Sequence, residues 1–322
     1  MSDLRVGVVG AGYFGRLHAM KVAASPRCTL SGVADADPGR AAAIATEFAA
    51  PAMPYPDLLA ASDAVVIAAP AAAHFALASE ALRAGKHVLV EKPIAATLAE
   101  ADALAALATT HRLVLQVGHL LRYTPEHAAI RARMPNPLYI DCIRIAPFKP
   151  RGTDVSVVLD LMIHDLDFVF SLVDSPVLCV AATGAPVASP LDDIATARIG
   201  FENGCIANIT ASRVALKTER KMRLFSQSTF LSVDFAACKL IQIARGPGTP
   251  IPQLEGAALQ EFTWQPDDAL AAEHAAFAAA ILENAPILVD AAAGRRALAG
   301  ALAVVASIGE QQARARAGGL LA

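Results

Sequence analysis

The stretch LRVGVVGAGYFG, residues 4–15, decides the fold of the first part of the chain. A short apolar run passes directly into Gly10, Gly12 and Gly15, which are spaced G-x-G-x-x-G. A buried strand followed by such a turn and a helix brings backbone amides close to a pyrophosphate, at the positive end of the helix. The stretch therefore predicts a dinucleotide site, and residues outside it test this prediction.

Asp35 ends the next apolar run, 20 residues after Gly15. A carboxylate at this place accepts hydrogen bonds from the adenosine ribose and repels a 2′-phosphate, so it favours NAD over NADP. Arg40 argues for NADP, because its guanidinium can reach a 2′-phosphate. The alternative for Asp35 is a polar turn residue within the sequence ADADP. We predict NAD as the cofactor and NADP as the less favoured choice.

Residues 1–120 alternate apolar runs with alanine-rich helical stretches, which predicts a parallel sheet covered on both faces. We expect an N-terminal Rossmann domain, a doubly wound α/β fold. The expected strands are residues 4–9, 28–35, 64–70, 87–91 and 113–118, and the expected helices are residues 14–24, 38–49, 72–84 and 97–110.

Residues 121–322 follow a different rhythm, with closely spaced β-like runs separated by turns such as Glu202-Asn203-Gly204. We predict an α+β domain with a large, mostly antiparallel open sheet, which binds substrate and forms oligomers. Its expected strands are residues 138–146, 177–183, 195–201, 205–212, 221–226, 230–235 and 239–244, and its expected helices are residues 155–173, 268–284 and 290–315.

The composition excludes several classes of protein. The net charge of −3 and a pI near 6.2 argue against a nucleic-acid binder. The mean hydropathy is +0.45, but the charge-free stretches 64–79 and 175–191 contain proline, so no membrane span is expected. The five cysteines are scattered and the N-terminus shows no export signal, which together predict a cytoplasmic protein with reduced thiols.

Two further motifs carry candidate chemistry. The segment VLDLMIHDLD, residues 158–167, places Asp160 and His164 four residues apart, on one face of a helix. The strand at residues 87–91 ends in Glu91-Lys92-Pro93. Taken alone, the first motif is better explained as a helix face turned to water, and the second as an ordinary strand exit.

The glycine turn, the E-K-P motif and the D-x-x-x-H motif in this order resemble the Gfo/Idh/MocA family of nicotinamide-dependent oxidoreductases, over essentially the whole chain. AAPAAAH, residues 68–74, also resembles a family segment, although Ala69 stands where a threonine is common. The resemblance implies that Lys92, Asp160 and His164 are catalytic. The predicted cofactor contacts are Gly10, Gly12, Tyr13, Phe14, Gly15, Asp35, Arg40, Ala69, Pro70, His74, Glu91 and Lys92.

The residues suit alcohol oxidation, in which the cofactor takes a hydride and the protein supplies a base for the hydroxyl proton. His164 titrates near neutrality, and Asp160 orients it. Lys92 donates a hydrogen bond to the same oxygen, and an oxidised nicotinamide nearby disfavours its charged form, so it is an alternative base. His119, His164 and Asp160 lack metal-ligand spacing, so no metal is expected.

The substrate prediction depends on LQVGHLLRYTPE at residues 115–126, the segment at residues 144–167 and ERKMRLFSQSTFLSVDF at residues 219–235. These strings resemble the family branch that oxidises the 3-hydroxyl of UDP-N-acetylglucosamine, whose ketone continues through a transaminase towards amide-linked lipid A. Residues 121–125 read LRYTP where that branch often has ERFNP, which puts the sugar contacts in doubt.

Cationic side chains near these strings are candidates for binding a diphosphate, although solvated surface charges are the alternative. His119 follows a strand of the parallel sheet at the end where ligands bind, and a packed histidine is its alternative. The predicted substrate contacts are Lys92, His119, Arg122, Lys149, Arg151 and His164.

Two other functions stay open. A dehydrogenase of a free sugar, inositol or small polyol would need neither Lys149 nor Arg151. A non-enzymatic, cofactor-binding regulator would tolerate the loss of Lys92 and His164, so their presence argues against it. Apolar strands in the second half predict a homodimer or homotetramer.

Overall fold

The computed structural model describes residues 3–148 and 155–320 of the 322-residue chain. The chain forms two compact units, and the first consists of residues 1–124 and Asp268–Leu298. The second consists of Pro125–Asp267 and residues 299–322. The predicted division at residue 120 is therefore close to the first boundary but omits the return of residues 268–298 to the first unit.

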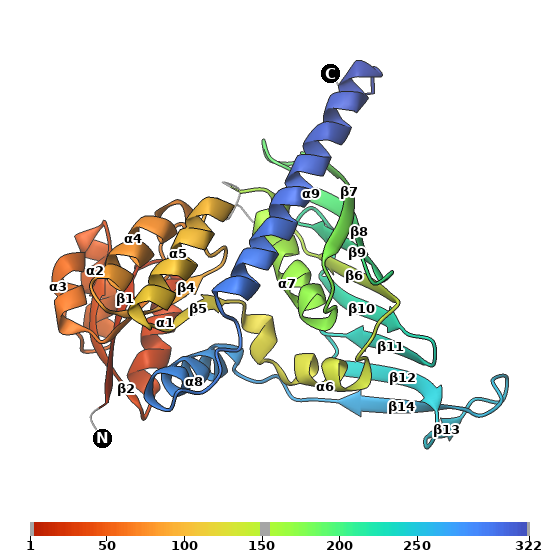
Figure 1. Cartoon of the computed structure of the whole chain (residues 1–322), viewed down its shortest axis with the longest axis horizontal. Helices are drawn as coiled ribbons and strands as arrows, with labels where there is room; N and C mark the ends of the chain where they lie inside the picture. Colours follow the sequence, from red (N-terminus) through yellow and green to blue (C-terminus); the bar gives the residue numbers. More distant parts are fainter. Residues whose placement is uncertain (1–2, 149–154, 321–322) are drawn as a thin grey trace. The chain divides into compact units, whose positions relative to one another are not determined.

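The first unit contains a five-stranded parallel sheet in the order β2-β1-β3-β4-β5 (Figure 1), as predicted for a doubly wound fold. Val65 and Val66 are neighbours in β3 and both fully buried, so both faces of the sheet are covered. The strands are β1 (Leu4–Val9), β2 (Cys28–Ala34), β3 (Ala64–Ile67), β4 (His87–Glu91) and β5 (Leu115–Gly118). The helices are α1 (Tyr13–Ala24), α2 (Pro38–Glu47), α3 (Tyr55–Ala61), α4 (Ala71–Arg83) and α5 (Leu98–His111).

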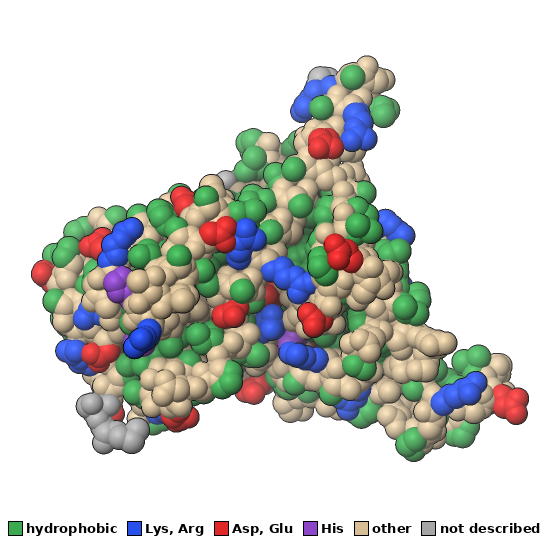
Figure 2. All heavy atoms as spheres, in the orientation of Figure 1, with side chains coloured by type: hydrophobic (Ala, Val, Ile, Leu, Met, Phe, Trp, Pro, Cys, Tyr) green, Lys and Arg blue, Asp and Glu red, His purple; other side chains and the backbone are tan. Residues whose placement is uncertain are grey.

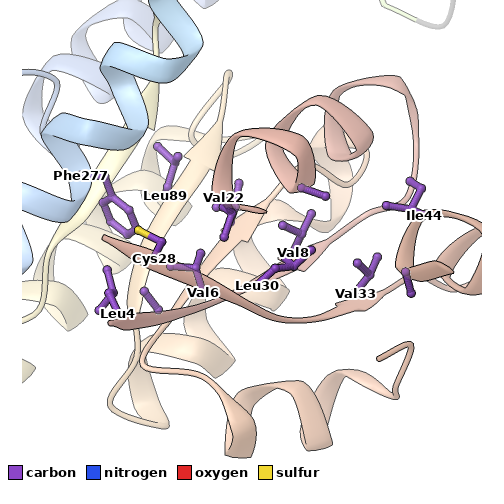
Figure 3. Close-up of a cluster of buried hydrophobic side chains, with 14 of the residues drawn as sticks. Leu4, Val6, Val8, Val22, Cys28, Leu30, Val33, Ile44, Leu89 and Phe277 are labelled. Atoms are coloured by element: carbon purple, nitrogen blue, oxygen red, sulfur yellow. The ribbon is translucent and has the colours of Figure 1, made fainter. Parts of the chain in front are cut away.

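The core of this unit explains why the chain returns to it. Helix α8 (Ala269–Leu282) packs against α1 and inserts Phe277, which is 1% exposed, among the buried side chains of β1 and β2 (Figure 3). Burying one aromatic side chain contributes about 2–3 kcal/mol relative to leaving it in water. Apolar burial thus fixes α8 on the N-terminal sheet, although more than 140 residues of the second unit separate them in the chain.

The second unit is built on a nine-stranded sheet in the order β13-β14-β12-β11-β10-β6-β9-β8-β7. Among the paired strands of this sheet in the described residues, only β6 and β9 run parallel, so the sheet is mostly antiparallel, as predicted. The strands are β6 (Tyr139–Ile145), β7 (Val177–Ala185), β8 (Ile194–Phe201), β9 (Ile206–Ser212), β10 (Glu219–Phe225), β11 (Thr229–Asp234), β12 (Lys239–Arg245), β13 (Thr249–Pro250) and β14 (Ala257–Thr263).

One face of this sheet is buried and the other is open. Leu224 is fully buried, whereas its neighbour Phe225 is 42% exposed. The buried face is covered in part by a π-helical turn, η2 (Val158–Met162), and by α7 (Ile163–Leu172), both of which contact β9. Helix α6 (Pro125–Arg133) precedes β6. The alternation of buried and exposed positions is typical of an antiparallel sheet with one solvated face.

Helix α9 (Ala291–Ala317) is the one helix of the described residues that is long and apolar enough to cross a membrane by length and composition. Two of its glycines, Gly294 and Gly300, pack closely against other elements. A Cβ on Gly294 would lie 2.7 Å from Val117, and a Cβ on Gly300 would lie 2.5 Å from Phe170. Such close packing is what a core helix of a globular domain requires.

Charged side chains of both signs are scattered over the face shown in Figure 2. Some form ion pairs, such as Arg5 with Asp63 at 2.6 Å, and Lys21 of α1 with Asp268 at 2.5 Å. Exposed pairs contribute about 0–1 kcal/mol each, so apolar burial rather than surface charge is the main stabilisation within each unit.

Candidate active site

The glycine turn after β1 has the geometry that the sequence predicts. Gly10 adopts φ +97°, and a Cβ there would lie 2.6 Å from the backbone of Ala68. A Cβ on Gly15 would lie 1.7 Å from the carbonyl oxygen of Gly10. By contrast, a Cβ on Gly12 would meet no atom of the described residues within 4 Å. Gly10 and Gly15 are therefore required by the fold, and Gly12 leaves open space at the start of α1.

Gly12 is also the N-cap of α1 and makes no side-chain capping hydrogen bond within the described residues. The amides of a helix N-terminus and the helix dipole favour an anion at this place. Tyr13 and Phe14 follow with exposed rings, 65% and 42% exposed, packed edge to face. These residues fit a nicotinamide dinucleotide. The start of α1 suits its pyrophosphate, and the exposed rings of Tyr13 and Phe14 suit contact with one of its ring systems.

Asp35 lies at the end of β2, next to the same turn. Its carboxylate accepts hydrogen bonds from the amide of Ala11 at 2.6 Å and from the amide of Asp37 at 2.8 Å. A cavity of about 690 Å³ opens beside it. The lining includes Gly10, Asp35, Arg40, Tyr55, Ala69, Pro70 and Leu77. This cavity brings five of the predicted cofactor contacts together.

Tyr55 is a cavity residue that the sequence analysis missed, because it lies in the short helix α3, outside every motif. Its hydroxyl donates to the carbonyl oxygen of Leu77 at 2.6 Å, so its ring is held against one wall. Arg40 is on the exposed rim and pairs with Asp37 at 3.4 Å. The guanidinium thus has a carboxylate partner of its own within the cavity lining.

His74 joins two of the loops that carry predicted site residues. Its ring nitrogens lie 2.8 Å from the carbonyl oxygen of Ala69 and 2.7 Å from that of Pro93. The side chain is only 1% exposed. His74 therefore braces the loop after β3 against the E-K-P loop.

Glu91 ends β4 and is 9% exposed. One carboxylate oxygen lies 2.9 Å from Nε2 of His18, and the other accepts the backbone N–H of Lys92 at 3.2 Å. Burial raises the pKa of Glu91, but the hydrogen bond and charge of His18, with the charge of Lys92, outweigh it and lower the pKa overall. Glu91 is thus an anion that contacts the backbone of the predicted catalytic lysine.

Asp160 and His164 lie in the second unit, on the segment that the sequence predicts as one helix. Asp160 belongs to the π-helical turn η2 and His164 to the first turn of α7, and both side chains are half-buried. π-helical turns are rare and occur frequently at functional sites. The expectation of a regular helix from residue 155 is corrected here: the described helical segment begins at Val158 and its first turn is wider.

Two close neighbours of His164 are buried. Asp165 is 5% exposed and accepts two hydrogen bonds from Arg144 of β6, at 2.6 and 2.7 Å. Asp167 is 2% exposed. These two carboxylates face the interior of the second unit, whereas Asp160 and His164 are half-buried, and their catalytic role stays a prediction.

The predicted substrate contacts are only partly described. His119 is 1% exposed and precedes a 3-10 turn, η1 (Leu120–Tyr123), at the end of β5. Arg122 donates to the carbonyl oxygen of Leu288 at 3.4 Å. Lys149 and Arg151 lie outside the described residues. His119 is therefore as buried as a packed histidine, and its contact with substrate stays a prediction.

A Rossmann unit with an open glycine turn, an acidic residue at the end of β2 and a lysine after β4 defines a nicotinamide-dependent oxidoreductase. The chain belongs to the Gfo/Idh/MocA family: residues 4–119 match its oxidoreductase domain with the NAD-binding Rossmann fold, and residues 129–228 match its C-terminal domain. It is a dehydrogenase whose first unit binds NAD.

Two relatives with named activities match nearly the whole chain. The UDP-N-acetylglucosamine 3-dehydrogenase of Acidithiobacillus ferrooxidans is 43% identical over 306 residues, 94% of this chain and 97% of the relative. A solved structure of that enzyme matches with a TM-score of 0.90 at 41% identity, over 96% of this chain and 98% of that one. The inositol 2-dehydrogenase of Rhizobium meliloti is 28% identical over 96% of this chain and 98% of its own length.

Proposed function

We propose that this protein oxidises the 3-hydroxyl of UDP-N-acetylglucosamine, or of a closely similar nucleotide sugar, with NAD. The observation that supports this substrate is the 43% identity to an enzyme of that name over nearly the full length of both chains. The relative named for inositol is 28% identical over a similar length. The product belongs upstream of a transaminase, on the way to a lipid A or surface-glycan precursor made in the cytoplasm.

The proposed chemistry assigns one task to each of three residues. Bound NAD supplies the hydride acceptor. His164 accepts the hydroxyl proton, and Asp160 orients its ring. Lys92 donates a hydrogen bond to the same oxygen and stabilises its developing negative charge, and it is the alternative base.

The nucleotide end of the substrate requires cationic groups. We assign Arg122, Lys149 and Arg151 to the diphosphate, because guanidinium groups bind phosphate oxygens in pairs and the lysine ammonium binds them as a point charge. His119 is assigned to the same ligand. Leu121 and Thr124 differ from the residues common in the UDP-sugar branch. We therefore expect the contacts to the sugar ring to differ from those of its relatives.

The test is to mix purified protein with NAD and UDP-N-acetylglucosamine and to follow the absorbance of the reduced nicotinamide. A sugar transaminase with an amino donor removes the ketone, so that an unfavourable equilibrium does not mask turnover. Lys92→Ala and His164→Ala are expected to lower kcat by about 10²- to 10⁴-fold, the usual contribution of a positioned acid or base. The exposed Lys217→Ala is the matched control and should retain the full rate.

NAD binding, measured by titration without sugar, should be unchanged in the His164 variant. The same assay with NADP is expected to be slower, because Asp35 repels a 2′-phosphate. Tight binding of NAD without turnover of the nucleotide sugar would reject this substrate.

Inositol is the second candidate, and the 28% identity to an inositol 2-dehydrogenase over the whole length is the observation in its favour. In the same assay, reduction of NAD by free inositol and not by the nucleotide sugar would select it. That result would also remove the diphosphate role assigned to Arg122, Lys149 and Arg151.

A further inference from the structure

Four titratable side chains meet in the interior of the first unit, next to the turn that carries Lys92. We call them the buried quartet: His18 of α1, Glu91 of β4, and Glu273 and His274 of α8. These residues are 0%, 9%, 0% and 4% exposed. Nδ1 of His18 lies 2.9 Å from Nε2 of His274, and Nε2 of His18 lies 2.9 Å from Glu91.

Helix α8 is held firmly enough to make this arrangement specific. Phe277, one turn beyond Glu273, is buried in the apolar cluster of Figure 3. The backbone carbonyl oxygen of Glu273 accepts a hydrogen bond from the side-chain amide of Gln116 at 3.2 Å, and Lys21 of α1 pairs with Asp268 at the N-cap of α8. Three independent contacts therefore fix where the quartet's α8 members lie.

Glu273 is the unusual member of the quartet. Both carboxylate oxygens are buried and have no hydrogen-bond partner among the described residues. Ligand atoms of His18, Glu91 and Glu273 nevertheless lie within 4.8 Å of one another. His18 can neutralise one of two carboxylates this close in a dry interior, but it cannot neutralise both. The other carboxyl group must hold a proton, unless a metal ion occupies the site.

The surroundings decide which carboxyl group is protonated. Glu91 has a histidine and a backbone N–H as donors, which lowers its pKa, whereas burial and the charge of Glu91 raise the pKa of Glu273 well above its usual value. His274 adds no positive charge, because burial first, and then the charges of His18 and Lys21, lower its pKa to about 3. The groups around the carboxyl pair thus place the proton on Glu273.

We propose that Glu91 is a positioning residue for Lys92, and that Glu273 maintains this role by holding the proton that the two buried carboxyl groups share. Glu91 accepts the backbone N–H of Lys92 while its other oxygen is held by His18. A protonated Glu273 leaves one negative charge behind the lysine instead of two. This inference rests on the proposed function only in giving Lys92 a catalytic task.

The kinetic test compares two isosteric substitutions of neighbouring buried residues. Glu91→Gln removes the anion and is expected to lower kcat by about 10²-fold, the cost of a small misplacement of a catalytic group. It is also expected to move the alkaline limb of the kcat profile to lower pH, because the ammonium form of Lys92, the hydrogen-bond donor of the proposed chemistry, loses a stabilising charge. Glu273→Gln replaces one neutral group by another and should leave kcat and its pH profile close to those of the wild type.

A merely structural role for both residues would lower the unfolding temperature of both variants and leave both pH profiles in place, which would overturn the proposal. A shifted profile in Glu273→Gln alone would also overturn it. Glu91→Asp keeps the negative charge and is the second variant. It is expected to retain the wild-type pH profile even where its unfolding temperature falls.

Two readouts need no substrate and separate this inference from the proposed function. Infrared spectra at neutral pH should show a protonated carboxyl band in the wild type and in Glu91→Gln that is absent from Glu273→Gln. The backbone amide resonance of Lys92, in protein labelled with ¹⁵N-lysine, should move in Glu91→Gln and stay in place in Glu273→Gln. An absent band, an unmoved Lys92 resonance, or one equivalent of bound divalent metal that Glu273→Gln loses would each reject the proposal.

Discussion

At the scale of single residues, the three glycines of the G-x-G-x-x-G turn have different structural roles. Gly10 and Gly15 allow backbone segments to approach more closely than any side chain permits. A Cβ on Gly12 would meet no atom of the described residues within 4 Å, so the fold does not require this glycine, and we predict that the dinucleotide does. Substitution of Gly10 or Gly15 should therefore affect the stability of the fold, whereas substitution of Gly12 should affect ligand binding.

Gly12→Ala and Gly15→Ala form a matched pair of variants. We expect Gly12→Ala to fold normally and to weaken NAD binding by about tenfold or more, because its methyl group occupies the approach to the pyrophosphate. Gly15→Ala should lower the free energy of unfolding by about 1–3 kcal/mol, because its Cβ collides with the carbonyl oxygen of Gly10. Chemical denaturation and NAD titration of both variants check this, and equal behaviour of the pair would contradict it.

Residues that belong to a motif were predictable from the sequence, and residues brought in by packing were not. The glycines, Asp35 and Lys92 stand at strand ends whose positions the apolar runs indicate. His18, Glu273 and His274 carry no motif and meet only because Phe277 docks α8 on the first sheet. Such a meeting of distant segments depends on tertiary burial, which spacing along the chain does not contain.

At the scale of elements, strands with continuous apolar runs were found at the predicted places to within three residues. Elements without a periodic pattern were missed: α3 is bounded and interrupted by Pro54 and Pro56, and β14 reads AALQEFT with few β-branched residues. The π-helical turn η2 was also missed, because an α-helix has the same apolar pattern. Propensity and periodicity identify the regular elements, while tertiary contacts determine these others.

Asp193 links several segments of the second unit through hydrogen bonds and one ion pair. It is fully buried at the entry to β8, accepts the amides of residues 187–189, and pairs with Arg213 at 2.7 Å. Arg213 also donates to the carbonyl oxygen of Val155, two residues before Val157, the N-cap of η2. The segment that carries Asp160 is thus tied to two strands through one ion pair.

Asp193→Asn is expected to lower the free energy of unfolding by about 3–5 kcal/mol, because it leaves the charge of Arg213 buried without its partner. Burial opposes ionisation of Asp193, but its backbone and Arg213 hydrogen bonds hold the pKa well below the ordinary value. Its stabilisation is therefore complete above the unfolded pKa of about 4 and decreases as the pH falls below it. Urea unfolding of the wild type, this variant and the exposed-site control Asp174→Asn, at neutral and acidic pH, checks both statements. A wild type that keeps its full stability in acid would contradict the pH dependence.

At the scale of the whole molecule, the open face of the nine-stranded sheet carries a row of apolar side chains across neighbouring strands. Tyr139, Phe225, Phe230 and Ile243 are register partners from β6 to β12, and the rings of Tyr139 and Phe225 stack at 5.1 Å. Leu224 and Leu231 fill the opposite, buried face. The sequence predicted apolar strands in excess of what one core needs, but the row itself requires the strand register, which the sequence alone does not specify.

This row predicts self-association, because contiguous exposed apolar surface on a stable protein is normally covered by a partner, and a second copy meets it most simply around a two-fold axis. We expect the wild type to sediment as a dimer or tetramer at micromolar concentration. Phe225→Asp should shift it to the monomer without unfolding it, because Phe225 is already 42% exposed and its loss opens no core. Leu216→Asp, at a fully exposed apolar residue outside the row, is the control and should leave assembly unchanged. Sedimentation velocity over a concentration series separates the cases: a monomeric wild type at every concentration, or a Phe225 variant that assembles as before, would show that this face is not the interface.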